Sequence, residues 1–175
     1  KDAVLASLVN NTGIIRANTV AEKDGKIMLL GGMTAGHTEV EGTLDASAPG
    51  GGDGGFIETS AAKVTIEETA IISTKAAEGH SGTWLIDPVD FTIAASGGDM
   101  TGATLTSNLA SNNVIIQSTS GGSGTAGDLN VNDTVSWRAN KFTLNAQNDI
   151  NINADMTATS TASLALEYGQ SAVAA

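Results

Sequence analysis

Short apolar segments recur at nearly constant spacing along the first half of the chain, and this repeat limits the folds that the chain can adopt. In one set, residues 13–17, 42–46 and 70–74 align at offsets of 29 and 28. In a second set, residues 25–29, 55–59 and 82–86 align at offsets of 30 and 27. A third set runs through Val40, Ile66 and Ile93 at offsets of 26 and 27. Three strands therefore recur about every 28 residues, which is typical of a repeat architecture.

Within each segment, apolar and polar residues alternate as they do in a strand with one buried face. Val64 and Ile66 fall on one face, whereas Lys63, Thr65 and Glu67 fall on the other. A unit of three short strands cannot bury its apolar face alone, but stacking successive units at the ~4.8 Å strand spacing pairs each backbone with the units above and below. We therefore expect an all-β fold, a right-handed parallel β-helix (β-solenoid) with about 28 residues per coil.

The repeat loosens after about residue 95, although strand-like segments continue. These segments are NVIIQS (113–118), GDLNVN (127–132), KFTLNA (141–146), DININA (149–154) and SLALEY (163–168). Residues 96–102 and 118–127 are rich in Gly and Ser, and we predict that they form protruding loops. We expect one β-helix segment over residues 1–175, part of a longer chain, with regular coils at 1–95 and less regular coils with protruding loops at 96–175.

The composition favours strands and turns and argues against several classes of partner. Gly and Thr each occur 21 times, and aromatic residues make up 3% of the chain against 41% for all hydrophobic residues, so the core must be largely aliphatic. The net charge of -11, with only eight Lys and Arg residues, argues against a nucleic-acid partner. No segment reaches the roughly 18 consecutive apolar residues of a spanning helix, so we expect no membrane insertion. The absence of Cys excludes a disulfide framework and fits a secreted or outer-surface bacterial protein.

Two expectations concern the core. Ile27, Ile57 and Leu85 each follow a glycine by two or three residues, so we expect them to form one inward-facing stack. The segment SGTWLIDP (81–88) contains the third copy of the second set, so we expect Trp84 to lie in a core strand that ends in a turn at Asp87-Pro88. The remaining aromatic residues are also expected mostly to face inward; they are Phe56, Phe91, Trp137, Phe142 and Tyr168.

Several polar motifs have a structural and a functional interpretation. A group of asparagines is predicted to occupy turns and stacked ladders, the alternative being a row that binds carbohydrate or ice. Its members are Asn140, Asn145, Asn148, Asn151 and Asn153. His37, Glu39 and Glu41 would share one strand face and could hold a divalent ion, although a solvated face is the simpler interpretation.

The glycine-rich runs GGGDGG (50–55) and GGSGTAGD (121–128) are similar to calcium-binding nonapeptide turns, but neither fits the motif. The second run has Ala126 where an Asp ligand would stand. The first run also fails as a phosphate loop, because it lacks the lysine and the following helix. We predict no catalytic, cofactor-binding or metal-binding residue, and no cofactor.

Three longer segments carry a resemblance to a known family. They are GGFIETSAAKVTI, then GTWLIDPVDFTI, then NDTVSWRANKFTLNAQNDININADMTATSTASLALEYG. In order and spacing they resemble the repeat region of filamentous-haemagglutinin-like exoproteins of two-partner secretion, which are large bacterial adhesins, and the resemblance extends from about Gly13 to Gly169. It implies a long right-handed β-helix that an outer-membrane transporter exports, and that stays on the cell surface or is released. The implied ligands lie on host cells, on other bacteria or on matrix polysaccharide. The family's amino-terminal secretion domain is not visible here, and the chain contains no Arg-Gly-Asp sequence.

The sequence therefore predicts a structural β-helix segment of a secreted or surface-exposed adhesin or extracellular fibre, not an enzyme, that mediates adhesion or contacts in a biofilm or matrix. The alternative is a carbohydrate-active β-helix enzyme, a polysaccharide lyase or hydrolase, since such enzymes use convergent carboxylates on one face of the coil. The candidate carboxylates are Asp87 with Asp90 and Glu67 with Glu68. Because an open solenoid end exposes unpaired strand edges, end-to-end self-association is a further possibility.

Overall fold

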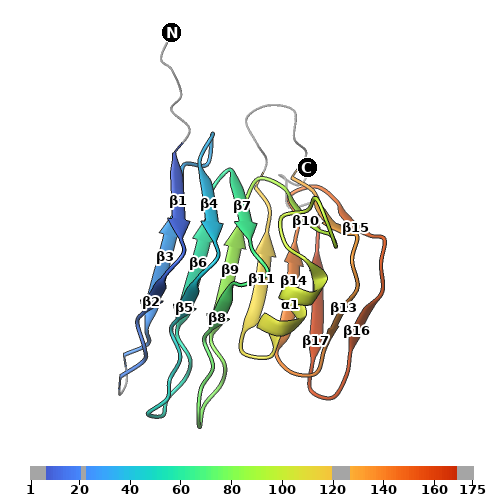
Figure 1. The fold of residues 1–175 in the computed structure, drawn as a ribbon. Coiled ribbons are helices and arrows are strands. Elements are labelled where there is room, and N and C mark those ends of the chain that lie inside the picture. The colour runs from blue at the N-terminus through green and yellow to red at the C-terminus, as the bar shows by residue number, and fades with distance from the viewer. Residues whose placement is uncertain (1–6, 21–22, 120–126, 169–175) are drawn as a thin grey trace, which may run out of the picture.

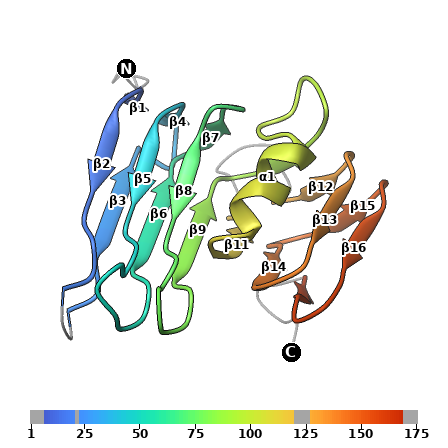
Figure 2. The ribbon, with the colours of Figure 1, turned by 60° about the horizontal axis from the view of Figure 1, so that its bottom comes forward.

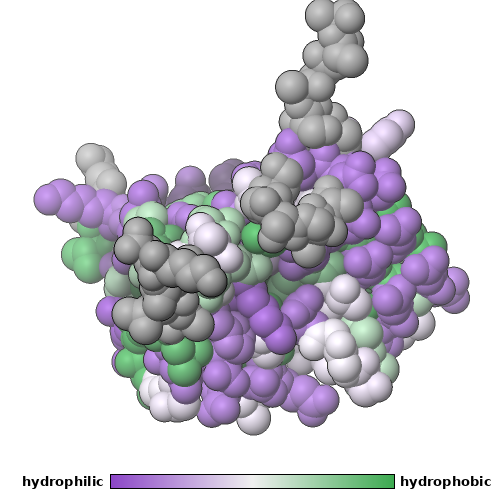
Figure 3. Space-filling model, turned by 90° about the horizontal axis from the view of Figure 1, so that it is seen from above, coloured by the Kyte–Doolittle hydropathy of each residue, from purple (hydrophilic) through white to green (hydrophobic). Residues whose placement is uncertain are grey.

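A computed structural model describes residues 7–20, 23–119 and 127–168. Over these residues the chain is mostly short strands with one short helix, and every pair of named strands is parallel (Figure 1). The predicted all-β parallel character is therefore confirmed. Viewed from above, hydrophilic residues cover much of the surface, and hydrophobic residues show between them in smaller groups (Figure 3).

The first two sets of repeated segments form strands in the predicted register, and Val40 and Ile66 of the third set also pair as predicted. One three-stranded sheet contains β1 (Leu8–Asn11), β4 (His37–Val40) and β7 (Lys63–Ile66). A second contains β2 (Ile14–Arg16), β5 (Thr43–Asp45) and β8 (Ile71–Ser73). In the second sheet Ile15 pairs with Leu44, and Leu44 pairs with Ile72, as the alignment of residues 13–17, 42–46 and 70–74 predicts.

A six-stranded sheet runs the length of the molecule and holds the centre of the core. In spatial order it contains β17 (Ser163–Glu167), β14 (Lys141–Asn145), β11 (Asn113–Gln117), β9 (Thr83–Asp87), β6 (Phe56–Ser60) and β3 (Lys26–Leu30). One column of paired residues is buried along five of these strands: Ile27, Ile57, Trp84, Val114 and Phe142. These five stacked side chains form the apolar core of this sheet.

The expectation that Leu85 belongs to this column is wrong. Leu85 pairs with Glu58 and is half-buried on the outer face, whereas Trp84 pairs with Ile57 and is fully buried. The alternation of a strand allows only one of two adjacent residues to face inward, and the larger apolar surface of the tryptophan takes that position. The core strand of this segment is confirmed and β9 ends at Asp87, but the chain bends at residues 89–90, just after the predicted turn at Asp87-Pro88.

Stacked glycines explain why the second set begins with glycine in each copy. A Cβ atom on Gly55 would lie far inside the van der Waals radius of the Gly25 carbonyl, and a Cβ on Gly82 would collide in the same way with Gly55. The backbones approach one another so closely here that no side chain fits between them.

Two further sheets lie in the second half of the described chain. One contains β10 (Phe91–Ile93), β12 (Leu129–Val131) and β15 (Ile150–Ile152), and the other contains β13 (Val135–Trp137) and β16 (Met156–Ala158). The alignment of Ile93 with Ile66 is corrected by the structure. The Ile66 N–H donates to the carbonyl of Asp99, and Ile93 forms a bridge with Met100, so the 99–100 segment lies between β7 and β10.

A helix, which the sequence repeat did not predict, interrupts the stack of strands. α1 (Gly102–Leu109) lies between β8 and β13 (Figure 2) and contacts both. Thr101 caps its first turn by accepting a hydrogen bond from the Thr104 N–H at 3.1 Å, and Leu105 and Leu109 are fully buried one turn apart. The predicted loop at 96–102 is therefore shorter than expected, because Gly102 already belongs to the helix.

Four of the six aromatic side chains face the core as predicted. Trp84, Phe91 and Phe142 are at most 1% exposed, and Trp137 packs edge-on against Phe142 with ring centroids 5.9 Å apart. Phe56 is half-buried under the Lys26 ammonium group, and Tyr168 is 71% exposed, so these two are the exceptions to the prediction that the aromatic residues mostly face inward. Phe56 lies at an outward position of β6, because the neighbouring Ile57 takes the inward one.

Candidate functional site

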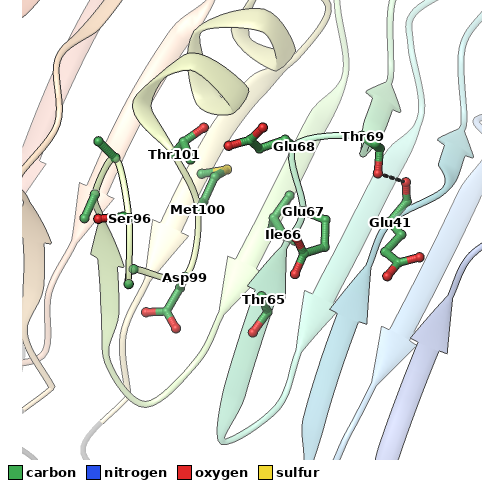
Figure 4. A pocket seen from close by; sticks show the side chains of 14 residues that line it. Glu41, Thr65, Ile66, Glu67, Glu68, Thr69, Ser96, Asp99, Met100 and Thr101 are labelled. Carbon is green, nitrogen blue, oxygen red and sulfur yellow. Dashed lines mark hydrogen bonds between the residues drawn. The ribbon is translucent and has the colours of Figure 1, made fainter.

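A groove of about 650 Å³ lies between the end of β7 and the loop at residues 94–101. Loop residues Ser96, Asp99 and Thr101 line one side, and Glu67 and Thr65 line the other (Figure 4). The groove is open to solvent, and its walls are mixed polar and apolar. We name it the acidic groove, after its four carboxylates, Glu41, Glu67, Glu68 and Asp99.

The loop forms one wall because it folds back between two strands. The Asp99 N–H donates to the carbonyl of Thr92 at 2.8 Å, and the Ala94 N–H donates to the carbonyl of Met100 at 3.0 Å. Gly97 has a φ of 70°, a conformation that glycine adopts at no steric cost. Met100 is 2% exposed and anchors the returning chain in the core.

The half-buried position of Asp99 shifts the pKa of its carboxyl group. Burial raises this pKa, while a hydrogen bond from the Thr92 N–H to Oδ2 at 2.9 Å and the nearby Lys63 ammonium group oppose that shift. The sequence pattern missed Asp99 as a groove residue, since it lies in a segment predicted only to protrude.

A smaller hollow of about 340 Å³ continues the acidic groove towards α1 and shares Glu68, Ala95 and Thr101 with it. Asp133 also lines this hollow and accepts a hydrogen bond from the Gly102 N–H at 2.8 Å. The first amide of the helix is thus already bound to a carboxylate, and the helix dipole is met by a negative charge there.

The chemistry of the acidic groove suits a cationic or hydroxyl-rich ligand. Of the residues that line it, none is Lys, Arg or His. Carboxylate and hydroxyl oxygens can accept hydrogen bonds from sugar hydroxyls or ammonium groups. The predicted pair Glu67 and Glu68 both line this groove, which brings them together with Glu41 from the predicted polar row.

The two carboxylates of the other predicted pair, Asp87 and Asp90, accept hydrogen bonds from different partners. Asp87 Oδ1 accepts a hydrogen bond from the Thr119 hydroxyl at 2.9 Å. Asp90 Oδ1 accepts from the Gly127 and Asp128 N–H groups at 3.0 and 2.9 Å. Burial raises the pKa of Asp87, the Thr119 hydrogen bond opposes this, and the Glu58 charge adds to it. Neither residue lines the acidic groove.

The polar row on β4 has the predicted alternation. Thr38 and Val40 are fully buried, and His37 and Glu39 lie on the outer face. His37 Nε2 lies 2.9 Å from the Thr65 hydroxyl oxygen, within hydrogen-bond distance. Within residues 7–20, 23–119 and 127–168, no three His, Asp or Glu side chains are grouped so as to hold a metal ion.

The structure describes all of the first glycine-rich run but little of the second. Residues 50–55 form a loop in which Asp53 Oδ1 accepts a hydrogen bond from the backbone N–H of His80 at 2.7 Å. Most of the second run, including Ala126, lies outside the described residues.

Two of the five asparagines form the predicted ladder, along the β10-β12-β15 sheet, whereas Asn145 lies in strand β14 and not in a turn. Asn151 donates to Asn130 Oδ1 at 3.0 Å, and Asn153 donates to Asn132 Oδ1 at 2.8 Å. Asn140 has a φ of 67°, so it takes the left-handed turn conformation predicted for this group.

No protein-family model, no curated protein and no solved structure matches the chain. Among the described residues, no helix is both long and apolar enough to span a bilayer.

Proposed function

We propose that the chain is a segment of a right-handed parallel β-helix with about 28 residues per coil, and that it forms a structural part of a secreted or surface-exposed bacterial adhesin or fibre. The observation that carries the proposal is the order of the strands. Consecutive strands β1, β2 and β3 go to three different sheets, and β4–β6 and β7–β9 follow in the same order. In a β-helix, each coil contributes one strand to each of three sheets, and the next coil begins beside the first strand of the coil before it.

The spacing of paired residues supports the same proposal. Val9 pairs with Thr38, and Thr38 pairs with Val64, at separations of 29 and 26 residues. In the six-stranded sheet the separations are 30, 27, 30 and 28 from β3 to β14. The final separation, from β14 to β17, falls to 22, which agrees with less regular coils in residues 96–175.

The adhesin function rests on the resemblance to filamentous-haemagglutinin-like exoproteins together with the surface chemistry. The net charge of -11 and the lack of Cys suit an extracellular rod. In this proposal an outer-membrane transporter exports the parent chain. The exposed segment then contacts a ligand on host cells, on other bacteria or on a polysaccharide, and the acidic groove is the site that we assign to this ligand.

A bead-adhesion assay tests this function. Beads carrying the protein are expected to bind epithelial cells, bacteria or immobilised polysaccharide better than beads carrying albumin. The double variant Glu67→Gln with Glu68→Gln should reduce binding, whereas Glu78→Gln, an exposed change outside the groove, should not. Equal binding by all beads would count against the adhesin, and binding unaffected by the double variant would count against the groove.

The enzyme alternative is tested with the unmodified chain and with the single variants Glu67→Gln and Asp87→Asn. Each is incubated with a panel of acidic and neutral polysaccharides, and reducing ends and unsaturated products are measured. Turnover that is lost in Glu67→Gln or in Asp87→Asn, with the strand signal in circular dichroism unchanged, would replace the structural proposal by a lyase or hydrolase.

A further inference from the structure

The three faces of the molecule differ in whether their sheets are continuous. The six-stranded sheet runs without a break from β3 to β17. Each of the other two faces is divided, one between β7 and β10 and the other between β8 and β13. Both breaks lie beside the pair β9 and β11 of the continuous sheet, at the level of α1 (Figure 2). The described residues therefore form an N-terminal part, β1–β9, and a C-terminal part, β10–β17 with α1, and one sheet is shared by both parts.

The first break is filled by residues 99–100, which are bound unequally to its two sides. On the C-terminal side, the Asp99 N–H donates to the Thr92 carbonyl at 2.8 Å, and the Thr92 N–H donates to Asp99 Oδ2 at 2.9 Å. The Ala94 N–H also donates to the Met100 carbonyl at 3.0 Å. On the N-terminal side, the Ile66 N–H donates to the Asp99 carbonyl at 2.8 Å. Residues 99–100 therefore belong to the C-terminal part, and they meet the end of β7 without forming a ladder along it.

The second break is filled by α1, which binds both sides through side chains. Towards β8, Asn108 Oδ1 accepts the Ile72 N–H at 2.8 Å. Towards β13, the Ser136 N–H donates to the Thr106 hydroxyl at 3.1 Å. A backbone ladder is stiff because its donors and acceptors are fixed in the chain, whereas these side-chain groups lie on rotatable bonds. The joint on this face is therefore more compliant than the pairing of β9 with β11.

The two divided faces are also longer than the continuous face at this level. Residues 99–100 and β10 both lie between β7 and β12, whereas β11 alone lies between β9 and β14. An extra strand adds about 4.8 Å, and a helix with its side chains is about 10 Å across. The space between β8 and β13 is accordingly wider than the space between β5 and β8 (Figure 2). The two parts are therefore splayed, with the continuous sheet on the inside of the bend.

The acidic groove lies across the first break. Glu41, Thr65 and Glu67 form its wall on the N-terminal part, and Ser96 and Asp99 contribute to its wall on the C-terminal part (Figure 4). Because the two walls belong to different parts, a change in the angle between the parts changes the width of the groove.

We propose that the chain is hinged at this level: the N-terminal and C-terminal parts bend about the pairing of β9 with β11, and the bend angle sets the width of the acidic groove. A ligand that contacts both walls then binds one angle better than another, so ligand binding and bending are linked. The breaks lie in the middle of the sequence, so further coils at either end would leave the hinge in place. The inference depends on the order of the sheets and on the position of the groove, and it does not depend on the adhesin function.

Pulsed electron paramagnetic resonance between two spin labels tests the hinge, and the chain has no Cys of its own to label. Ile14→Cys with Ser136→Cys places the labels on a divided face, from β2 to β13. The matched protein, Lys26→Cys with Lys141→Cys, places them on the continuous face, from β3 to β14. All four native side chains are exposed, and the second pair lies in one column of paired residues, four strand spacings or about 19 Å apart.

The distance distribution is expected to be about twice as wide or wider for the divided face as for the continuous face, because the hinge moves the first pair and hardly moves the second. Circular dichroism shows whether both labelled proteins keep their strands. Equal widths in two folded proteins would overturn the hinge.

The link to the groove has its own pair of labels, Glu41→Cys with Ser96→Cys, one on each wall. This pair is expected to give a distribution broader than that of Lys26 with Lys141, because its two walls move with different parts. A distribution as narrow as that of the continuous face would show that the walls move together, and it would overturn the proposed control of groove width.

Discussion

Asn108 and Ile72 are 36 residues apart in the chain, and the side-chain oxygen of Asn108 accepts the backbone N–H of Ile72 at 2.8 Å. Four residues later, Asn112 Oδ1 accepts the Thr74 N–H at 2.7 Å, and Asn112 Nδ2 donates to the Ile72 carbonyl at 2.8 Å. The rise of four helical residues, about 6 Å, nearly equals the rise of two strand residues, about 6.7 Å. One asparagine in the last turn of α1 and one just after the helix therefore make hydrogen bonds to the backbone N–H and C=O groups along the edge of β8, as a neighbouring strand would.

Asn112→Ala is expected to destabilise the fold by about 2–4 kcal/mol, because it leaves the Thr74 N–H and the Ile72 carbonyl buried without partners. The free energy of unfolding is measured by urea denaturation. Asn153→Ala removes an asparagine whose hydrogen bond to Asn132 is exposed, and it should cost less than about 1 kcal/mol. Equal losses would mean that Asn112 contributes no special contact to β8.

The sequence predicted the strands of the first half well but missed this helix. The register of residues 25–29, 55–59 and 82–86 follows from alternation and from the crowded glycines, and both are visible as sequence patterns. An eight-residue helix has too few apolar positions to stand out, and the contacts around it depend on amide groups of Asn108 and Asn112 whose partners lie far away in the sequence. The acidic groove was missed for a similar reason, since it depends on a loop that returns beside Thr92.

Trp84→Ala should cost about 3–5 kcal/mol, because the side chain is fully buried between Ile57 and Val114. Trp84→Phe should cost less, since it keeps most of the apolar volume but leaves the Thr59 hydroxyl without the indole N–H that lies 3.2 Å away. Urea denaturation followed by circular dichroism gives both values. The matched control is Leu85→Ala on the outer face, and a loss as large as that of Trp84→Ala would contradict the assigned register.

The pH dependence of stability should change in opposite directions when Asp87 and Asp45 are replaced by Asn. Burial raises the pKa of Asp87 above 3.8, so the folded state binds this proton more tightly than the unfolded state does. The stability that the bound proton contributes is present at low pH and is lost as pH rises through the folded pKa. Burial alone would also raise the pKa of Asp45, but hydrogen bonds from Ser47, Arg16 and Asn18 outweigh it and lower that pKa below 3.8. Its contribution is therefore present above pH 3.8 and is lost as pH falls through the folded pKa.

Thermal melts of both variants between about pH 2.5 and 7 measure this difference, since that window extends to both sides of the ordinary aspartate pKa. Asp87→Asn should leave stability at neutral pH unchanged or slightly higher, because Asn can still accept from the Thr119 hydroxyl and carries no buried charge. Asp45→Asn should lower stability at neutral pH and converge on the wild type in acid. Parallel curves for the two variants would contradict the assigned environments.

Gly55→Ala should be destabilising by about 1–3 kcal/mol or should shift the local backbone, since its Cβ would collide with the Gly25 carbonyl oxygen. Gly50→Ala is the matched control in the loop that precedes the same strand, because nothing lies within 4 Å of a Cβ at that position. Gly50→Ala should be neutral or slightly stabilising through the reduced entropy of the unfolded chain. Urea denaturation of both variants gives the comparison. If Gly55→Ala were as stable as Gly50→Ala, the backbones of successive layers could not approach as closely at Gly25, Gly55 and Gly82 as the structure has them, and the register that aligns these three glycines would have to be revised.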